Sequence, residues 1–280
     1  MIPKFFKILI AIAVSLKTSQ SFTEIKNENL GFAQKIRYFM AHPYKNFAYD
    51  IYVDKYKVKK FVSNVIKTAE VYAYFAKDKE IETFDYNSLP DSFVIKATHS
   101  CHQDIFVTDK RKFNKNEAIS KMKLWIKKKY LKYREMQYAQ LTPGIVIEEY
   151  LGDNISVYSF DMFHGKLELL KIEFDHFIEM KVNYYDRDWN LLDLQRGPPN
   201  DRNPDNPLTK KPKNLDKLVD LAYKLTEKIG NPPYVRIDLY NINNVPYFSE
   251  YTFTPVYGST QFKPYEAELY FGSLLHLPGE

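Results

Sequence analysis

The chain has 280 residues, of which 45% are hydrophobic and 27% are charged. These fractions are ordinary for a folded protein with a sizeable core, and they exclude wholesale disorder. The only cysteine, Cys101, excludes an intramolecular disulfide framework and a cysteine-based structural zinc site. The formal net charge of +5 is too small to indicate nucleic acid, so we expect no nucleic-acid partner. It is compatible with polyphosphate ligands or with proximity to an anionic membrane surface.

The first 22 residues form an apolar N-terminal segment with two alternative interpretations. Lys4 and Lys7 precede an apolar run at residues 8–16, as they do in a secretory signal. The run is too short to span a bilayer as a helix, and an amphipathic or buried first helix also explains it. We therefore expect a cytoplasmic protein, and a secreted or membrane-anchored one if residues 1–22 are a signal.

Hydrophobic periodicity predicts both helices and strands along the rest of the chain. Helical spacing predicts helices at residues 55–73, 116–133 and 214–229, the last with Asn214 as N-cap and Gly230 as its stop. Short apolar runs predict strands, and pairs of them predict two hairpins with turns at His164-Gly165 and at residues 241–244. The predicted strands are residues 93–97, 105–107, 145–147, 157–163, 166–174, 234–240 and 245–251. We therefore expect an α+β or mixed α/β fold.

A long irregular connection is expected at residues 197–212. This stretch contains five prolines and several asparagines and aspartates. Such residues favour turns and disfavour regular elements. It is therefore the best candidate for a loop that faces a substrate.

Two lysines are candidate phosphate ligands. Lys55 follows Asp54 at a predicted helix start, where its charge could lie over a phosphate; a surface lysine beside an N-cap is the simpler alternative. Lys96 ends an apolar strand, where an ammonium is costly unless it meets an anion. The polar residues 98–104 behind it predict a hairpin loop able to fold over a phosphate. The two histidines in that loop, without a third partner, are weak candidates for metal ligands.

Two acids end the predicted strand at residues 145–147. A strand of this kind can present its backbone to an adenine edge, while Glu148 or Glu149 bonds an amino group or a ribose hydroxyl. Acids at a strand end are also common on plain surfaces, so both interpretations stay open.

The strongest candidate site is the C-terminal hairpin. Arg236 and Asp238 alternate along one strand and therefore share a face. Glu250 and Thr252 follow on the partner strand, and the turn should bring Asp238 and Glu250 close together. Two close carboxylates repel unless they share a cation, and Mg²⁺ suits a site of few protein oxygens completed by phosphate. An ordinary cross-strand ion pair between Arg236 and an acid is the alternative.

The order of these elements resembles the TupA-like ATP-grasp family, which is associated with teichuronopeptide, capsule and other surface-polysaccharide gene products. The resemblance covers the chain from about residue 45 to the end. The segments that carry it are residues 54–62, 89–99, 145–151, 184–192 (YYDRDWNLL), 211–225, 235–255 (VRIDLYNINNVPYFSEYTFTP) and 274–278.

The resemblance implies an α+β fold of the ATP-grasp type, with two α+β lobes and a nucleotide between antiparallel sheets. It divides the chain into an N-terminal helical region at residues 23–90, a small lobe at 91–150 and a C-terminal lobe with the metal site at 151–280. The implied cofactors are ATP and Mg²⁺. The implied substrate is a small-molecule or glycan-linked carboxylate.

Carried over by position, the resemblance assigns roles to eight residues. Lys55 and Lys96 would bind phosphates, and Ile147 with Glu148 would form the adenine hinge. Asp238 and Glu250 would hold Mg²⁺, with Thr252 where many ATP-grasp enzymes have asparagine. Arg236 would face the transferred phosphate and, with Lys96, act in catalysis. The implied reaction is ligation of a carboxylate and an amine through an acyl phosphate, which requires positioning and charge neutralisation rather than a covalent enzyme intermediate.

Two departures from the family pattern leave alternatives open. Where the family usually reads His-Gly-Ser-Gly, this chain reads residues 99–102 as His-Ser-Cys-His, and a basic position of the family reads Ser159. Glycine permits positive φ and close approach of backbone amides to phosphate, so a nucleotide-binding-deficient pseudoenzyme is one alternative. A second alternative has a separate basis. Asp186 and Asp188 imitate an Asp-x-Asp metal motif, which would indicate a glycosyltransferase-like enzyme. We interpret those acids as a surface turn with Trp189 packing inward.

Overall fold

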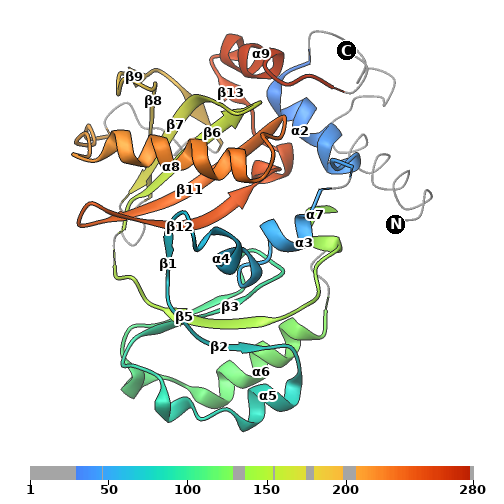
Figure 1. The fold of residues 1–280 in the computed structure, drawn as a ribbon, viewed down its shortest axis with the longest axis vertical. Coiled ribbons are helices and arrows are strands. Elements are labelled where there is room, and N and C mark those ends of the chain that lie inside the picture. Colours follow the sequence, from blue (N-terminus) through green and yellow to red (C-terminus); the bar gives the residue numbers. More distant parts are fainter. Residues whose placement is uncertain are drawn as a thin grey trace.

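The computed structural model describes residues 30–45, 47–128, 136–153, 155–174, 180–197 and 206–277. The expected N-terminal segment, residues 1–22, lies outside the described residues. Figure 1 shows a larger lobe built on one sheet, a smaller lobe built on another, and short helices between them. Among the described residues, no helix is long and apolar enough to cross a membrane.

The larger lobe is built on a seven-stranded sheet with the order β1-β12-β11-β6-β7-β8-β9. All neighbours are antiparallel except β1, which pairs parallel with β12. Helix α8 (Leu215–Lys228) crosses this sheet in Figure 1. The strands are β1 (Lys67–Thr68), β6 (Val157–Phe163), β7 (Lys166–Phe174), β8 (Lys181–Tyr185), β9 (Leu191–Leu192), β11 (Tyr234–Ile242) and β12 (Val245–Thr252).

The smaller lobe is a four-stranded antiparallel sheet with the order β2-β5-β3-β4. Helices α5 and α6 lie below it in Figure 1, and their apolar side chains share one core with the sheet. Its elements are β2 (Val71–Phe75), α5 (Asp78–Thr83), η2 (Tyr86–Ser88), β3 (Phe93–Ala97), β4 (Asp104–Val107), η3 (Lys110–Lys112), α6 (Lys115–Ile126) and β5 (Ile145–Glu149).

Alternation along β11 decides which residues face the larger core and which face the cleft. Ile237 and Leu239 are fully buried in one core cluster with Leu225 of α8. Arg236 and Asp238 must then project from the opposite face, because successive side chains of a strand alternate. The burial of the apolar face therefore sets the direction in which the charged residues point.

Only part of the charged face of the large sheet is covered. At one end Tyr234 packs edge-on against Phe32, with ring centroids 5.1 Å apart. Phe262 and Phe271 belong to the same core cluster. The elements that build this cover are α2 (Phe32–Ala41), β10 (Gln195–Arg196), β13 (Phe262–Lys263) and α9 (Tyr265–Ser273), whereas α3 (Tyr49–Tyr52), α4 (Lys57–Val62), α7 (Met136–Ala139) and η4 (Pro255–Gly258) complete the described fold.

Most predicted elements are confirmed. The strands at residues 93–97, 105–107 and 145–147 are β3, β4 and β5, and the two hairpins are β6–β7 and β11–β12. The second hairpin turns more tightly than predicted, at Asn243 and Asn244, whose φ values of 51° and 62° fit a two-residue type I′ turn. Gly230 has a φ of 81°, as expected of a residue that ends a helix.

Asn214 is the N-cap residue of α8, as expected, but its side chain does not cap the helix. Its amide nitrogen instead donates to the side-chain oxygen of Asn241 and to the backbone oxygen of Asn244, both at 3.0 Å. The residue therefore ties the start of α8 to the β11–β12 hairpin.

The predicted helix at residues 55–73 is wrong beyond its first half. Helix α4 ends at Val62, and the chain then forms β1 and β2. Val71–Phe75 is rich in β-branched and aromatic residues, and pairing with β5 gives its backbone groups partners. Tertiary pairing therefore overrides a helical spacing that continues past the true helix end.

The small lobe extends further toward the N-terminus than residue 91. Strand β2 belongs to the same sheet as β3 and β5, so the stretch expected to be an N-terminal helical region contributes a strand to it. Helix α6 covers the first part of the predicted helix at 116–133, whereas residues 129–133 lie outside the described residues. Residues 198–205, in the predicted connection at 197–212, also lie outside the described residues. The remaining domain boundaries stay predictions.

The packing of α8 leads to a stability prediction. Leu225 is fully buried, so Leu225→Ala should lower the free energy of unfolding by about 2–5 kcal/mol through lost burial and a cavity. Leu208 is 73% exposed, and Leu208→Ala should change stability by less than about 0.5 kcal/mol. Denaturant unfolding of the two variants beside the wild type measures both. Equal effects would contradict the assignment of this core.

Candidate active site

A cavity of about 540 Å³ lies between the two lobes. The small lobe contributes the ends of β3 and β5 and the loop before β4. The large lobe contributes the charged face of β11 and β12. The charged residues that line the cleft are Lys55, Lys59, Lys96, Asp104, Glu148, Glu149, Glu173, Arg236, Asp238 and Glu250.

Lys55 reaches the cleft because Asp54 fixes the start of α4. The buried Asp54 carboxylate accepts hydrogen bonds from the backbone nitrogens of Tyr56 and Lys57, both at 2.9 Å. These are the hydrogen bonds of an N-capping side chain, although the helix proper begins at Lys57 and its N-cap position is Tyr56. The Lys55 ammonium donates a hydrogen bond to the backbone oxygen of Ser100. The backbone nitrogen of Lys55 donates to the backbone oxygen of Thr98. Lys55 is thus held against the loop that the sequence predicts to fold over phosphate.

Lys96 meets an anion, as the position of a lysine at the end of a buried strand requires. Its Nζ lies 2.6 Å from Oε1 of Glu148, and Lys59 Nζ lies 2.9 Å from Oε2 of the same carboxylate. One buried carboxylate therefore holds two ammonium groups. This arrangement satisfies charges that would otherwise be costly to bury.

The predicted adenine hinge divides into two different environments. Ile147 is fully buried in the core of the small lobe, and in the sheet it is paired with Ile95 of β3 on one side and with Ala73 of β2 on the other. Glu148 points the other way, toward the cleft, but its carboxylate is engaged by the two lysines. The hinge role of both residues stays a prediction.

Arg236 and Asp238 form a buried bidentate ion pair along β11. Arg236 Nε and Nη2 donate to the two carboxylate oxygens of Asp238, at 2.8 and 2.6 Å. Both side chains are shielded, with 13% and 5% of their surface exposed. Arg236 therefore has a tight partner on its own strand, Asp238, and a more distant one across the hairpin, Glu250, so the alternative of a cross-strand ion pair describes only its weaker contact.

Glu250 lies beside this pair, as the sequence predicts. Asp238 and Glu250 are directly opposite in the β11–β12 register, and Arg236 is opposite Thr252. Glu250 Oε1 is 3.6 Å from Arg236 Nη2 and accepts from the Thr252 hydroxyl at 3.2 Å, while its side chain is 42% exposed. Within the described residues, no three His, Cys, Asp or Glu side chains form a metal-binding group. A cation here would share two acids and need further oxygens from its ligand.

The pKa values of the buried groups follow from these contacts. Burial opposes the charge of Lys96, but Glu148 outweighs it, and the pKa of Lys96 is raised. Burial likewise opposes ionisation of Glu148, but the two lysines lower its pKa overall. For Lys59 burial prevails, and its pKa is lowered despite Glu148. Asp238 similarly outweighs burial and raises the pKa of Arg236.

Lys59, Glu173 and Tyr240 are among the cleft residues that the sequence did not single out. Lys59 lies four residues after Lys55, a spacing that places both on one side of a helical turn and could have been noticed. Val157 of β6 is paired with Tyr240 of β11 on one side and with Glu173 of β7 on the other. No local sequence signal marks them, because only the pairing of three strands brings them to the cleft.

The loop after Lys96 contains a residue other than glycine in the left-handed conformation that glycine adopts most easily. His102 has a φ of 58°, in the left-handed region that residues other than glycine occupy at a cost. His99 is buried, with its Nε2 3.2 and 3.1 Å from the backbone oxygens of Trp125 and Lys128. Its Nδ1 accepts from the backbone nitrogen of Gly144 at 3.3 Å. The imidazole thus fastens the loop to the end of α6 and leaves no role for His99 as a metal ligand.

Ser159 lies beside Asp238, on the strand next to the candidate metal site. It pairs with Asp238 on one side and with Lys171 on the other, and its buried hydroxyl has no hydrogen-bond partner in the described chain. Lys171 forms an ion pair with Glu173 on the same strand. A basic residue is therefore present one strand away from the position where the family pattern expects one.

The Asp186-Arg187-Asp188 motif forms a turn, as interpreted from the sequence. Asp186 Oδ1 accepts from the backbone nitrogens of Asp188 and Asn190 at 2.9 and 2.8 Å. Trp189 stacks on Tyr185, with ring centroids 4.4 Å apart. These contacts explain the motif by local structure alone.

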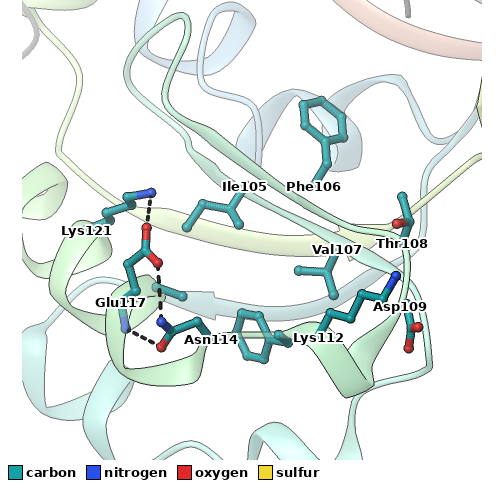
Figure 2. Close-up of a pocket in the computed structure, with 11 residues that line it drawn as sticks. Ile105, Phe106, Val107, Thr108, Asp109, Lys112, Asn114, Glu117 and Lys121 are labelled. Carbon is teal, nitrogen blue, oxygen red and sulfur yellow. Dashed lines mark hydrogen bonds and ion pairs between the residues drawn. The ribbon is translucent and has the colours of Figure 1, made fainter.

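A second cavity of about 230 Å³ lies on the small lobe, outside the cleft. Figure 2 shows its apolar floor of Ile105 and Val107 from β4, and the Lys121–Glu117 ion pair of α6 at its rim. Asn114 caps the same helix by accepting from the backbone nitrogen of Glu117 at 3.1 Å. The polar groups of Asn114, Glu117 and Lys121 thus stabilise α6 itself.

The family of the chain follows from a family-model match. The TupA-like ATP-grasp model matches residues 34–276, which is most of the chain. The protein therefore belongs to the TupA-like ATP-grasp family, and its two α+β lobes with antiparallel sheets are the ATP-grasp fold that the sequence predicts. No curated protein sequence matches the chain.

Solved structures resemble the chain at low sequence identity. D-alanine–D-alanine ligase from Helicobacter pylori is 14% identical, with a TM-score of 0.48 over 81% of this chain and 62% of that one. L-amino acid ligase from Bacillus licheniformis is 14% identical, with a TM-score of 0.48 over 86% and 54%. The Bacillus anthracis D-alanine–D-alanine ligase complexed with ATP is 17% identical, with a TM-score of 0.42 over 73% and 54%. The chain thus spans a little over half the length of these ligases.

The buried His99 leads to a prediction for pH dependence. Burial lowers its pKa below the ordinary value of 6.5, so the folded state favours the neutral ring. The stabilisation is complete above that value and is lost as pH falls toward the folded pKa, because the unfolded chain binds a proton first. His99→Gln should therefore flatten the decline in unfolding free energy between roughly pH 7 and 5. His42→Gln serves as control, and an unchanged slope in His99→Gln would contradict the prediction.

Proposed function

We propose that the protein is a Mg-ATP-dependent carboxylate–amine ligase that works through an acyl phosphate. The observation that carries the proposal is the convergence of Lys55 and Lys96 from one side of the cleft with Arg236, Asp238 and Glu250 from the other. Basic groups opposite acids across one cavity suit a polyphosphate with a divalent cation. Membership of an ATP-grasp family supports the same conclusion.

The oxygen donors of the hairpin fit Mg²⁺. Asp238, Glu250 and Thr252 would hold the ion, with water and phosphate supplying the remaining oxygens. Glu250 is the more available acid, because Arg236 already bonds both oxygens of Asp238. When bound, the ion would neutralise charge on the phosphates.

The residues of the cleft act by holding and neutralising charge. Lys55 and Lys96 bind the phosphates, and Arg236 faces the phosphoryl group that is transferred. An oxygen of the substrate carboxylate attacks the γ-phosphorus, the bond to the β,γ-bridging oxygen breaks, and ADP leaves. The amine nitrogen then attacks the acyl carbon, phosphate leaves with the former carboxylate oxygen, and the amine proton passes to solvent. No protein side chain needs to form a covalent bond.

For the substrate we propose a small-molecule or glycan-linked carboxylate in surface-polysaccharide biosynthesis, of capsular or teichuronopeptide type. The resemblance to a family associated with such polymers supports this choice. Peripheral proximity to a membrane is part of the same proposal and rests on the mildly basic composition.

The test is calorimetry of Mg-ATP binding. We expect wild-type protein to bind, and Glu250→Gln to lose at least about tenfold in Mg-dependent affinity while remaining folded, since one ion ligand is removed. Glu266→Gln is the matched control, because Glu266 is an exposed acid that does not line the cleft. No binding by wild type at millimolar nucleotide would end the proposal.

The altered loop offers a separate test of the pseudoenzyme alternative. His102 adopts a positive φ that glycine adopts freely, so His102→Gly should keep or strengthen Mg-ATP binding. If wild type shows no affinity and the Ser100→Gly/His102→Gly variant gains it, the chain is a nucleotide-binding-deficient member of the family. Asp188→Ala should leave nucleotide binding unchanged, because this acid lies in the turn already described.

A further inference from the structure

One buried cation of the cleft has no role in the reaction described above. Lys59 keeps only 12% of its side-chain surface exposed. Its Nζ donates to the backbone oxygen of Ala69 and to Glu148 Oε2, each at 2.9 Å. Both partners face inward from different segments, so the ammonium is fixed in place rather than directed at a ligand.

The Ala69 contact lies where the chain passes between the two sheets. Ala69 and Glu70 are the only residues between β1, which pairs in the large sheet, and β2, which pairs in the small one. Glu149 follows Glu148 on β5 and exchanges hydrogen bonds with Glu70, its backbone nitrogen donating at 2.8 Å and its carboxylate accepting at 3.2 Å. Lys59 therefore holds Glu148 in a fixed relation to the connection between the lobes.

Glu148 competes for Lys96 with any bound phosphate. Its Oε1 is 2.6 Å from Lys96 Nζ, and at that distance an unshared carboxylate would bind the ammonium strongly. Lys59 divides the charge of this carboxylate between two cations.

We propose that Lys59 is a positioning residue that keeps Lys96 available to phosphate by sharing the carboxylate of Glu148. The inference rests on the proposed function, because it concerns the phosphate-binding lysine of that same cleft. Lys59 acts through Glu148 and does not touch the phosphate itself.

A double-mutant cycle on Lys59 and Glu148 tests this inference. The probe is inorganic tripolyphosphate with Mg²⁺, measured by calorimetry, so that any contact of Glu148 with adenine does not enter. Lys59→Met should weaken binding about tenfold, and Glu148→Gln should not weaken it, because the competing anion is gone. In the Glu148→Gln background, Lys59→Met should change affinity by less than about twofold. Lys60→Met is the matched control, since Lys60 is exposed on the same helix.

The other outcomes overturn the inference in distinguishable ways. A tenfold loss that persists in the Glu148→Gln background would mean that Lys59 binds phosphate directly. An equal loss from Glu148→Gln alone would mean that the ion pairs are only structural. If wild type binds neither Mg-ATP nor Mg-tripolyphosphate, both the inference and the proposed function fail. If wild type binds and Lys59→Met binds equally well, only the inference fails.

Folding is monitored by thermal unfolding of each variant. Should Lys59→Met not fold, Lys59→Gln replaces it, because glutamine retains a donor for the Ala69 oxygen without the charge. Lys59→Arg should restore most of the affinity, since it returns a cation to Glu148. Failure of Lys59→Arg to improve on Lys59→Gln would contradict a role through charge.

Discussion

The architecture of the cleft depends on burying charges together with their counter-ions. Arg236 can sit at 13% exposure only because both of its donors meet Asp238, and Lys96 can end a buried strand only because Glu148 receives it. Removing one member of such a pair would leave an uncompensated charge in a region of low dielectric. The apolar faces of the two sheets determine where the strands lie, and these ion pairs determine which charged groups the strands direct toward the cleft.

The two lobes solve the same problem in different ways. On the large sheet a cation and an acid alternate on one strand, and a second acid faces them from the partner strand. On the small lobe one acid is shared by two lysines from different elements. The result is one carboxylate that holds two ammonium groups on one wall and a partly exposed carboxylate, Glu250, on the other. This asymmetry distinguishes the cleft from an ordinary surface network of ion pairs, in which charges are screened by solvent.

The sequence predicted those features whose partners lie close along the chain. The β11–β12 hairpin follows from alternation and from a two-asparagine turn, so the approach of Asp238 and Glu250 was readable. The fate of residues 63–75 was not, because the choice between helix and strand there was made by β12 and β5, which come much later in the chain. The spacing of Lys59 from Lys55 was visible in the sequence, but its contact with Glu148 was not, because Glu148 lies on β5. The side-chain direction of Ile147, by contrast, followed from strand alternation and was available from the outset.

The short crossing at Ala69 and Glu70 has a mechanical consequence. With two residues between β1 and β2, there is almost no slack between the sheets. Any rocking of the small sheet must pull on β1, and through its ladder on β12, the strand that bears Glu250. A single motion of the small sheet would therefore change both the width of the cleft and the position of Glu250.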